Sequence, residues 1–355
     1  MRIFHICDIA NRANGIYSVL KPLSKEQIRL GHQVYVLNVN KSGYNDEFLK
    51  LISINDLKSK IDSERPDVVL FHGIFYRAII PLSNHLIKLN IPYLIELHGS
   101  MSLLNIGISK YKKKLAALLF LNKIIINANG IIYLNMQEYC LSAIRQLNSK
   151  SIIIPNGVYR NLSPLGHKIG EKIEIIYLGR IHRSHKGIDH LIDALKILQA
   201  NGHDKDIHVS FYGRIIPEEE KWFKQQINEL SSIANYVGPV YGTDKEKAFS
   251  ESNIFILTSR YEGFPMGILE ALSFGCPCIV SPMTNVADVI FTHKCGWVVP
   301  LDSQAIAEKI LEASSQYRIN SKELIDNSIS ASSYYDWKDI AGKSISEYVK
   351  AITNI

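Results

Sequence analysis

Long hydrophobic runs are absent from this sequence. The longest apolar stretch, residues 115–126, is interrupted by Asn122 and Lys123 and falls short of the roughly 20 residues that a membrane-crossing helix needs. Few apolar residues precede Asp8, and no small-residue cleavage site follows it. We therefore expect neither a membrane-spanning helix nor a signal peptide.

Cysteine is also scarce, with five in 355 residues and no regular spacing. This excludes a disulfide framework and fits a reducing cytoplasm. Cys276 and Cys278 flank Pro277 inside an apolar run, so we interpret them as small buried apolar residues and not as metal or redox ligands.

Positive charge is distributed unevenly. Residues 1–165 hold 20 Lys and Arg against 10 Asp and Glu, a net charge of +10, and residues 166–355 hold 20 against 24, a net charge of −4. The two sum to the overall +6. A basic first half suggests an anionic partner there, such as lipid headgroups, a phosphorylated acceptor or nucleic acid.

Short runs of Ile, Val and Leu alternate with longer amphipathic stretches, which predicts parallel sheets covered by helices on both faces. In the first half we predict strands at 2–6, 33–39, 67–71, 93–97, 130–134 and 151–154, and a helix over 16–30 that ends at Gly31. The pattern restarts after a polar linker at 160–171, with strands at 173–178, 208–212, 235–237, 254–257, 278–281 and 297–299.

The predicted fold class is thus α/β, with two Rossmann-like doubly wound domains facing a cleft. We place the first domain at residues 1–165, together with a helix at about 335–355, and the second at residues 166–334. Ligands of such sheets bind at the carboxyl ends of the strands.

The segment EGFPMGILE, residues 262–270, follows a predicted strand and opens a helix. Its free N–H groups could bind an anion such as a diphosphate, and Gly263 would let a ligand approach the backbone. Glu262 and Glu270 could accept hydrogen bonds from hydroxyl groups. From spacing alone, a surface glutamate and a helix-face glutamate with no role in binding are the alternative interpretation.

A basic loop, LGRIHRSHKG, follows the first strand of the second domain. Arg180 and Lys186 could neutralise a departing diphosphate without a metal, although a solvated basic loop remains the alternative. The spacing of His182, His185 and His190 fits no zinc pattern. Asp204 and Asp206 form a D-x-D pattern of a kind that can hold a metal ion, but they precede a strand and we interpret them as a solvated loop.

Together these motifs resemble glycosyltransferase family 4, retaining enzymes of the GT-B fold. The resemblance covers GR-x5-KG, FYG at 211–213, the stretch 253–281 and GWVVP in the second half. In the first half it covers the loop before Gly15, ELHG at 96–99 and PNGV at 155–158, and the last helix looks like the family's helix that crosses back to the first domain.

The resemblance implies a role for each motif position. Arg180 and Lys186 would hold the donor diphosphate, Glu262 would contact the transferred sugar, Glu270 would hold the ribose, and His98 would lie beside the anomeric carbon. The implied donor-binding set is Gly15, Gly179, Arg180, Lys186, Gly213, Glu262, Gly263, Phe264, Pro265, Met266 and Glu270. The implied acceptor-side set is Asn14, Gly15, His72, His98 and Gly99, with His72 equally open to a structural role.

The sequence departs from the family in two loops. Asn14-Gly15 stands where many members carry two glycines, and MTNVADVI at 283–290 stands where many carry Gly-Gly. The donor sugar is therefore open. The resemblance implies transfer of a hexose-type sugar from a UDP-sugar or a GDP-sugar to a glycan or lipid-linked glycan, in bacterial surface polysaccharide or lipopolysaccharide assembly, with no cofactor and no metal.

A basic, apolar segment at 100–123 contains Lys110, Lys112, Lys113 and Lys114. Such a segment could rest on an anionic membrane surface, which predicts a cytoplasmic protein peripheral to the inner face of the plasma membrane, or it could be a solvated helix start. The rival functions are a nucleotide-sugar epimerase, a non-catalytic partner subunit and a nucleotide-binding regulator. A nucleic-acid partner is not expected, because no Walker loop or helix-turn-helix signature occurs.

Overall fold

The computed structural model describes residues 1–11, 15–100, 121–161 and 170–353. The chain divides into two compact units, Met1–Gly157 with Trp337–Ile355, and Val158–Asp336. The predicted boundary between residues 165 and 166 lies outside the described residues. The two units are described separately below.

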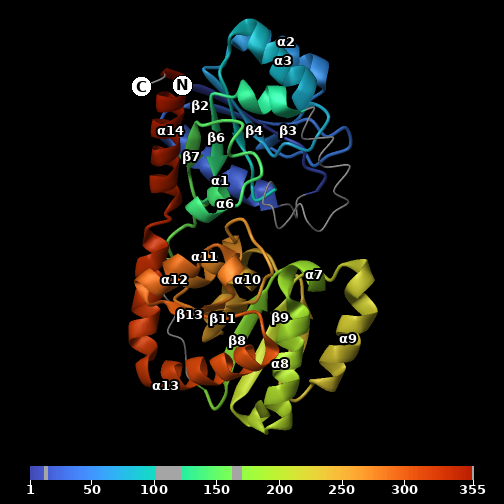
Figure 1. Cartoon of the computed structure of the whole chain (residues 1–355), viewed down its shortest axis with the longest axis vertical. Helices are drawn as coiled ribbons and strands as arrows, with labels where there is room; N and C mark the ends of the chain where they lie inside the picture. Colours follow the sequence, from blue (N-terminus) through green and yellow to red (C-terminus); the bar gives the residue numbers. More distant parts are fainter. Residues whose placement is uncertain (12–14, 101–120, 162–169, 354–355) are drawn as a thin grey trace. The chain divides into compact units, whose positions relative to one another are not determined.

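The first unit is built on a seven-stranded parallel sheet in the order β3-β2-β1-β4-β5-β6-β7 (Figure 1). Its strands are β1 (Arg2–Cys7), β2 (Gln33–Asn38), β3 (Leu49–Leu51), β4 (Val68–His72), β5 (Tyr93–Glu96), β6 (Gly130–Tyr133) and β7 (Ser151–Ile153). Every residue of β4 and β5 is buried, as expected for strands covered on both faces.

The helices of this unit with described bounds are α1 (Gly15–Arg29), α2 (Ile54–Glu64), α3 (Ile79–Leu89), α6 (Met136–Cys140) and α14 (Trp337–Thr353), and residues 121–126 are also helical. The last helix, α14, packs against α1, so the end of the chain returns to the first unit as predicted (Figure 1). One hydrogen bond across this pair joins Gln27 to Ser344 at 3.0 Å.

The second unit holds a six-stranded parallel sheet in the order β10-β9-β8-β11-β12-β13. Its strands are β8 (Ile173–Leu178), β9 (Ile207–Tyr212), β10 (Ala234–Gly238), β11 (Ile254–Leu257), β12 (Cys278–Val280) and β13 (Gly296–Val298). Its α-helices are α7 (Arg183–Lys186), α8 (Ile188–Ala200), α9 (Glu220–Glu229), α10 (Gly242–Ser250), α11 (Met266–Ser273), α12 (Ala287–His293) and α13 (Ser303–Ser333). Short 3-10 turns, η1 (His203–Lys205), η2 (Pro217–Glu219) and η3 (Pro282–Thr284), complete the unit.

In both sheets the strand order reverses next to the first strand of the unit, between β1 and β4 and between β8 and β11. This is the switch point at which doubly wound sheets bind ligands, beyond the carboxyl ends of the strands. The structure confirms the two predicted Rossmann-like sheets, and every predicted strand lies within one residue of an observed one. It adds β3, which is too short for its alternation to be recognised.

Two smaller predictions concern second-unit residues. Cys276 and Cys278 are buried, as expected for small apolar residues. Asp204 lies in η1 and Asp206 follows it immediately before β9, so the D-x-D sequence is at the amino end of a strand, away from the ligand-binding edge of the sheet.

Candidate functional site

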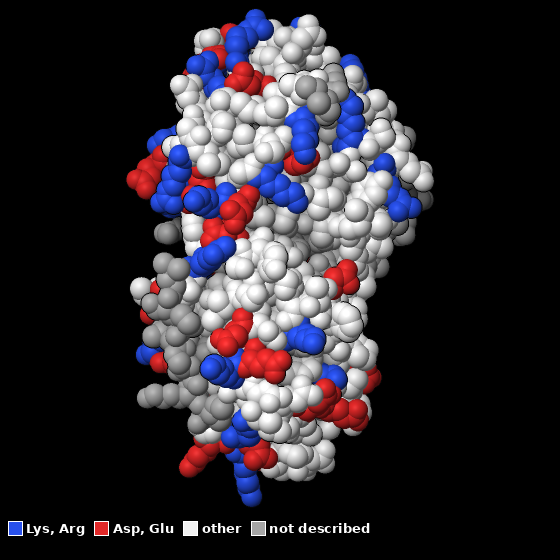
Figure 2. Space-filling model, turned by 90° about the vertical axis from the view of Figure 1, so that its left-hand side faces the viewer, with Lys and Arg blue, Asp and Glu red and all other residues white. Residues whose placement is uncertain are grey.

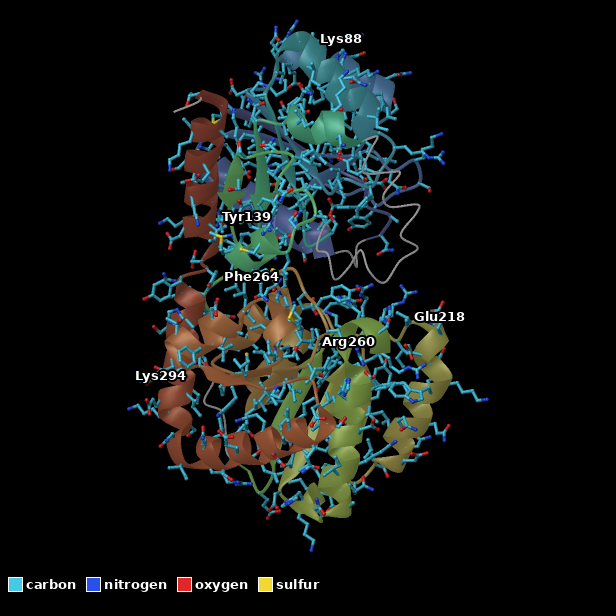
Figure 3. All side chains as sticks on the ribbon, in the orientation of Figure 1. Lys88, Tyr139, Glu218, Arg260, Phe264 and Lys294 are labelled. Atoms are coloured by element: carbon cyan, nitrogen blue, oxygen red, sulfur yellow. The ribbon has the colours of Figure 1, made fainter. Side chains whose placement is uncertain are left out.

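Four loops of the second unit gather at the carboxyl ends of neighbouring strands. They follow β8, β9, β11 and β12, and the first and third of these strands flank the switch point of the sheet. The loops contain Gly179 and Arg180, Gly213, the 258–265 segment and Asn285. Arg260 and Phe264 both lie in the upper part of the second unit in Figure 3, at this end of the sheet. The predicted donor-site residues of the second unit therefore lie at one edge of its sheet.

Glycine is required where two of these loops meet. Gly213 has a φ of +133°, and a Cβ atom built on it would lie 1.9 Å from the carbonyl oxygen of Gly179. Gly187, with a φ of +61°, would bring a Cβ within 2.0 Å of the carbonyl oxygen of Thr258. A side chain at either position would push apart loops that must lie in contact.

Lys186 and Glu262 form an ion pair at this edge. Lys186 ends α7, a short helix within the loop that the sequence predicted, and Glu262 comes from the loop after β11. The two side chains are only 12% and 10% exposed, so the pair is largely shielded from water. The structure thus joins two residues that were predicted separately and lie 76 positions apart.

The carboxylate of Glu262 is held in its charged form. Burial raises its pKa, but the charges of Lys186 and His185 and the hydrogen bonds from Lys186 and Ser259 outweigh burial and lower the pKa below its usual value. Ser259 donates its hydroxyl to Glu262 Oε1 at 2.5 Å. Burial, followed by the charge of Lys186, lowers the pKa of His185 to about 4, so this ring is neutral near pH 7.

Arg180 is an exposed cation at this edge. In the described part of the chain, no carboxylate forms an ion pair with its guanidinium, and the hydroxyl of Tyr177 donates to its backbone carbonyl at 3.0 Å. An exposed guanidinium on a fixed backbone can donate two parallel hydrogen bonds to the oxygens of an anion.

The helix α11 begins at the same edge of the sheet, after β11. Pro265 stands at its N-cap, just before the helix and not inside its first turn, and Gly263 precedes it in the loop. Met266 is the first helical residue and Phe264 is buried against Tyr335, with ring centroids 5.4 Å apart. The N–H groups of this helix start have no intrahelical partners and can face an anion.

Glu270, one turn into α11, is also paired. Lys245 of α10 donates to Glu270 Oε1 at 2.7 Å, and both side chains are partly exposed. Both predicted glutamates are thus held by lysines, which leaves the remaining carboxylate lone pairs for hydroxyl donors.

Sequence reasoning missed the residues that hold the 258–265 segment. Asn285, with a φ of +60°, donates its amide to the carbonyl oxygens of Glu262 at 2.6 Å and of Gly263 at 3.1 Å. Arg260 makes a bidentate ion pair with Asp189 at 2.6 and 2.7 Å. Asn285 lies in the stretch that departs from the family pattern, which was the one signal available for it.

In the first unit, the predicted residues lie near the β1–β4 switch point. His72 is the last residue of β4, and His98 follows β5 with a φ of +50°. Gly99, with a φ of +76°, donates its backbone N–H to the buried carboxyl of Glu138 at 2.6 Å. Gly15 opens α1 with open space around its α-carbon, and Asn14 lies outside the described residues.

His72, Glu96 and His98 offer ligand atoms that lie within 4.8 Å of one another, the one such group able to hold a metal ion in the described ranges. Both ring nitrogens of His72 already have protein partners: Nε2 lies 2.8 Å from His5, and Nδ1 lies 2.9 Å from His98 and 3.2 Å from Glu96. Hydrogen bonding within the protein therefore accounts for the cluster.

Solved structures with the same two-unit architecture define the class of fold. Sucrose-phosphate synthase of Thermosynechococcus elongatus superposes with a TM-score of 0.77 at 16% identity, covering 100% of both chains. Anabaena HepE in complex with UDP superposes with a TM-score of 0.74 at 15% identity, covering 99% of this chain and 100% of that chain. The fold is therefore the GT-B fold of glycosyltransferases.

Residues 164–330, almost the whole second unit, match the family described as "Glycosyl transferases group 1". Mannosylfructose-phosphate synthase of Agrobacterium fabrum is 24% identical over 174 residues, 47% of this chain and 38% of that protein. Lipopolysaccharide 1,6-galactosyltransferase of Escherichia coli is 34% identical over 124 residues, 34% of this chain and 33% of that protein. The second unit is therefore similar to the group 1 glycosyltransferases.

The matched segments cover less than half the length of the first curated relatives, 38% and 46%. Among the helices that the structure describes, none combines the length and apolar content needed to cross a bilayer.

Proposed function

We propose that this protein is a retaining glycosyltransferase that moves a hexose-type sugar from a nucleotide-sugar donor to a glycan or a lipid-linked glycan. Its relatives favour assembly of bacterial surface polysaccharide or lipopolysaccharide. They include the lipopolysaccharide 1,6-galactosyltransferase of Escherichia coli and a putative colanic acid biosynthesis glycosyltransferase of Salmonella typhimurium.

The observation that carries this proposal is the joining of Arg180, Lys186, Glu262 and the start of α11 at one edge of the sheet. When the bond between sugar and diphosphate breaks, negative charge grows on the leaving diphosphate. Arg180, Lys186 and the free N–H groups of the helix start, all in place before the reaction, would stabilise that charge. Preorganised groups of this kind often make the largest single contribution to lowering the activation free energy. They would do so without a metal ion.

The two glutamates have complementary tasks in this proposal. Glu262 would accept hydrogen bonds from the transferred sugar while Lys186, its ion-pair partner, reaches the diphosphate, and Glu270 would accept from the ribose hydroxyls. His98 would lie beside the anomeric carbon, and Gly15 and Gly99 would let backbone approach the substrates. The acceptor's proton would pass to a phosphate oxygen of the donor.

A UDP-sugar is the favoured donor, and a GDP-sugar is the next. The support is that Anabaena HepE was solved with UDP, with UDP and glucose, and with UDP-glucose. The catalytic domain of starch synthase IV from Arabidopsis thaliana was solved with ADP at a TM-score of 0.74, so ADP belongs in the same screen.

Donor turnover with EDTA present tests the reaction type. Release of nucleotide together with a sugar product that keeps the donor's anomeric configuration by NMR supports a retaining, metal-independent transferase. A product of the opposite configuration contradicts retention. Conversion into a second nucleotide sugar without nucleotide release favours an epimerase, and no turnover of any donor favours a non-catalytic partner subunit.

Attachment to an anionic membrane surface is a separate part of the proposal. The residues predicted for it, Lys110 and Lys112–Lys114, lie outside the described residues. On the face drawn in Figure 2, lysines and arginines of the first unit lie among acidic residues and do not form one patch. Sedimentation with phosphatidylglycerol vesicles tests the attachment, and an unbound protein at low salt would refute it.

A further inference from the structure

A tight turn at the carboxyl end of β5 contains His98. The backbone N–H of Ser100 donates to the carbonyl of Leu97 at 3.1 Å, which closes a four-residue turn. Its two central residues, His98 and Gly99, both have a positive φ, of +50° and +76°. A positive φ at both central positions is the pattern of a type I′ turn, in which glycine, asparagine and aspartate are the usual residues.

A histidine in this conformation is strained. In the left-handed region the Cβ atom of a non-glycine residue comes too close to the following carbonyl oxygen. Such a residue keeps a positive φ only where the surrounding structure holds it there, and residues held in this way cluster at functional sites. The contacts that hold this turn therefore help to determine where His98 lies.

Glu138 of α6 holds the turn from outside. Its Oε1 accepts the backbone N–H of Gly99 at 2.6 Å, and its Oε2 accepts the backbone N–H of Leu134 at 2.6 Å. Leu134 follows β6, which is the neighbour of β5 in the sheet. One carboxylate therefore joins the ends of two neighbouring strands, and one of these strands leads directly into the turn that contains His98.

The helix α6 needs only one of these two hydrogen bonds. Asn135 is its N-cap and accepts the N–H of Glu138 at 2.7 Å. A glutamate three residues after the N-cap ordinarily returns one hydrogen bond to the start of the helix, as in a capping box. The bond to Leu134, one residue before the N-cap, has this local role. The bond to Gly99 lies outside the motif and reaches a residue 39 positions away.

Burial of a carboxylate at this place is unfavourable. Glu138 is 2% exposed, and within the described ranges no lysine, arginine or histidine forms an ion pair with it. Burial raises its pKa to about 7, against the lowering effect of the hydrogen bonds from Leu134 and Gly99. A glutamine could complete the capping box without a buried charge. Only a carboxylate, however, accepts through both of its terminal atoms at once.

We propose that Glu138 is a positioning residue, whose carboxylate holds the turn at 97–100 and so keeps His98 in place at the end of β5. Glu138 lies too deep to touch a substrate and acts through His98. The ring of His98 has its own contact, with 2.9 Å between its Nε2 and His72 Nδ1. The catalytic consequence rests on the role proposed above for His98, but the hold on the turn does not.

Selective labelling of the full-length protein makes the turn visible by NMR without any substrate. With 13C at histidine carbonyls and 15N at glycine, only glycines that follow a histidine give a carbonyl-correlated amide signal, and the sequence has two, Gly73 and Gly99. Gly73 donates to the backbone carbonyl of Glu96 at 2.8 Å and is the internal reference. The variant Gly73→Ala assigns the two signals by the loss of one.

The variant Glu138→Met removes both acceptor oxygens and keeps the length of the side chain. We expect the Gly99 amide to exchange with solvent faster by about tenfold or more, as after loss of one hydrogen bond to a charged group, while Gly73 is unchanged. We expect kcat to fall by about tenfold with little change in the KM of the donor, as for a misaligned catalytic group. A Gly99 amide that exchanges as in the wild type overturns the proposal, and so does a wild-type kcat once that amide is released.

Glu138→Gln is the conservative variant. It keeps one acceptor oxygen and turns an NH₂ group toward the other backbone donor, so it can complete the capping box but cannot hold both N–H groups. We expect its kcat to lie between those of the wild type and Glu138→Met. If Glu138→Met does not fold, this variant makes the test, and a wild-type Gly99 amide together with a wild-type kcat contradicts the proposal.

Tyr93→Phe is the matched control, in β5 itself. It removes one buried hydrogen bond, from the Tyr93 hydroxyl to the carbonyl of Ile124 at 2.7 Å, and leaves the contact of Glu138 with Gly99 intact. We expect the Gly99 amide and kcat to stay at wild-type values, and an effect equal to that of Glu138→Met would overturn the proposal, because lost stability alone would then release the turn. If the wild type turns over no donor, the proposed function fails while the Gly99 amide still decides whether Glu138 holds the turn.

Discussion

At the scale of single residues, the ion pair between Lys186 and Glu262 is the most informative contact of the second unit. Lys186→Ala removes a cation proposed for the diphosphate, and we expect kcat to fall by about 10²–10³, equivalent to about 2.7–4 kcal/mol of transition-state stabilisation. Glu262→Ala should reduce turnover as well, because the sugar loses its acceptor. Steady-state kinetics on the folded variants checks both.

The exposed pair Lys224–Glu220 on α9, with 2.6 Å between Nζ and Oε1, is the matched control. Lys224→Ala should leave turnover at the wild-type level, since surface ion pairs contribute little. Because Lys186→Ala leaves a largely buried carboxylate unpaired, urea unfolding should show a lower stability for it than for Lys224→Ala. Wild-type turnover in Lys186→Ala would remove this residue from the mechanism.

A second prediction at the scale of single residues concerns Asn285, which holds the loop that contains Glu262. Asn285→Gly keeps the left-handed backbone accessible and deletes the two amide hydrogen bonds. We expect a loss of about 1–3 kcal/mol in stability and a weaker affinity for the nucleotide sugar. Asn90→Gly, at a φ of +54° in the first unit, is the control, and calorimetric titration of both variants with the donor makes the comparison. Equal affinities would show that Asn285 does not position the donor loop.

At the scale of elements, the loops after β8 and β9 depend on each other through Gly213. Gly213→Ala would drive a methyl group into the carbonyl of Gly179, so we expect a loss of several kcal/mol or failure to fold. Gly202→Ala has a positive φ of +79° but nothing within 4 Å, and only backbone strain of about 1 kcal/mol is expected for it. Thermal unfolding distinguishes them, and similar midpoints would contradict the close approach of the two loops.

Elements were more predictable than their contacts. Strands such as Ile173–Leu178 and Ile254–Leu257 were predicted at their observed bounds, because a buried parallel strand is a continuous apolar run between turn residues. Arg180, Lys186, Glu262 and Glu270 are predicted by motif, because strand ends and helix starts are visible in the sequence. Motifs do not predict the ion pairs Lys186–Glu262 and Lys245–Glu270 or the hydrogen bonds from Asn285, because only the folded chain brings these residues together.

The His5–His72–His98 chain shows the same limit. His5 reads as one polar residue inside an apolar strand, RIFHIC, and nothing local indicates that its ring meets a histidine 67 positions away. The register of β1 with β4 and of β4 with β5 is needed to see it.

At the scale of the whole molecule, the pKa values of His5, His72 and His98 predict how the free energy of unfolding depends on pH. Their pKa values of about 3, 3 and 4 lie below the unfolded value of 6.5, so below pH 6.5 the unfolded chain binds protons that the folded chain does not. The free energy of unfolding should be highest above pH 6.5 and fall toward pH 4, by up to about 1.4 kcal/mol per pH unit for each histidine. Glu138 has the opposite effect on the free energy of unfolding. Burial raises its pKa to about 7, so the folded chain keeps a proton there that the unfolded chain has released, and the stability that this proton contributes is lost as the pH rises through 7.

Tryptophan fluorescence can follow the first unit alone. The chain has three tryptophans, and a Trp222→Phe, Trp297→Phe background leaves Trp337, which belongs to the first unit. Urea unfolding from pH 4.5 to 7.5 should show stability rising with pH, with a smaller slope in His5→Gln. A slope that His5→Gln does not change would contradict the neutral buried ring.

The central claim for the whole molecule is a donor site at the carboxyl edge of the second sheet that works without a metal ion. Calorimetric titration of UDP, GDP and ADP with EDTA present, on the wild type and on Lys186→Ala, tests it most directly. We predict binding of one nucleoside diphosphate, UDP first, and a much weaker affinity in the variant. Binding of none by the folded wild type, or equal binding by both proteins, would contradict the assignment of this edge as the donor site.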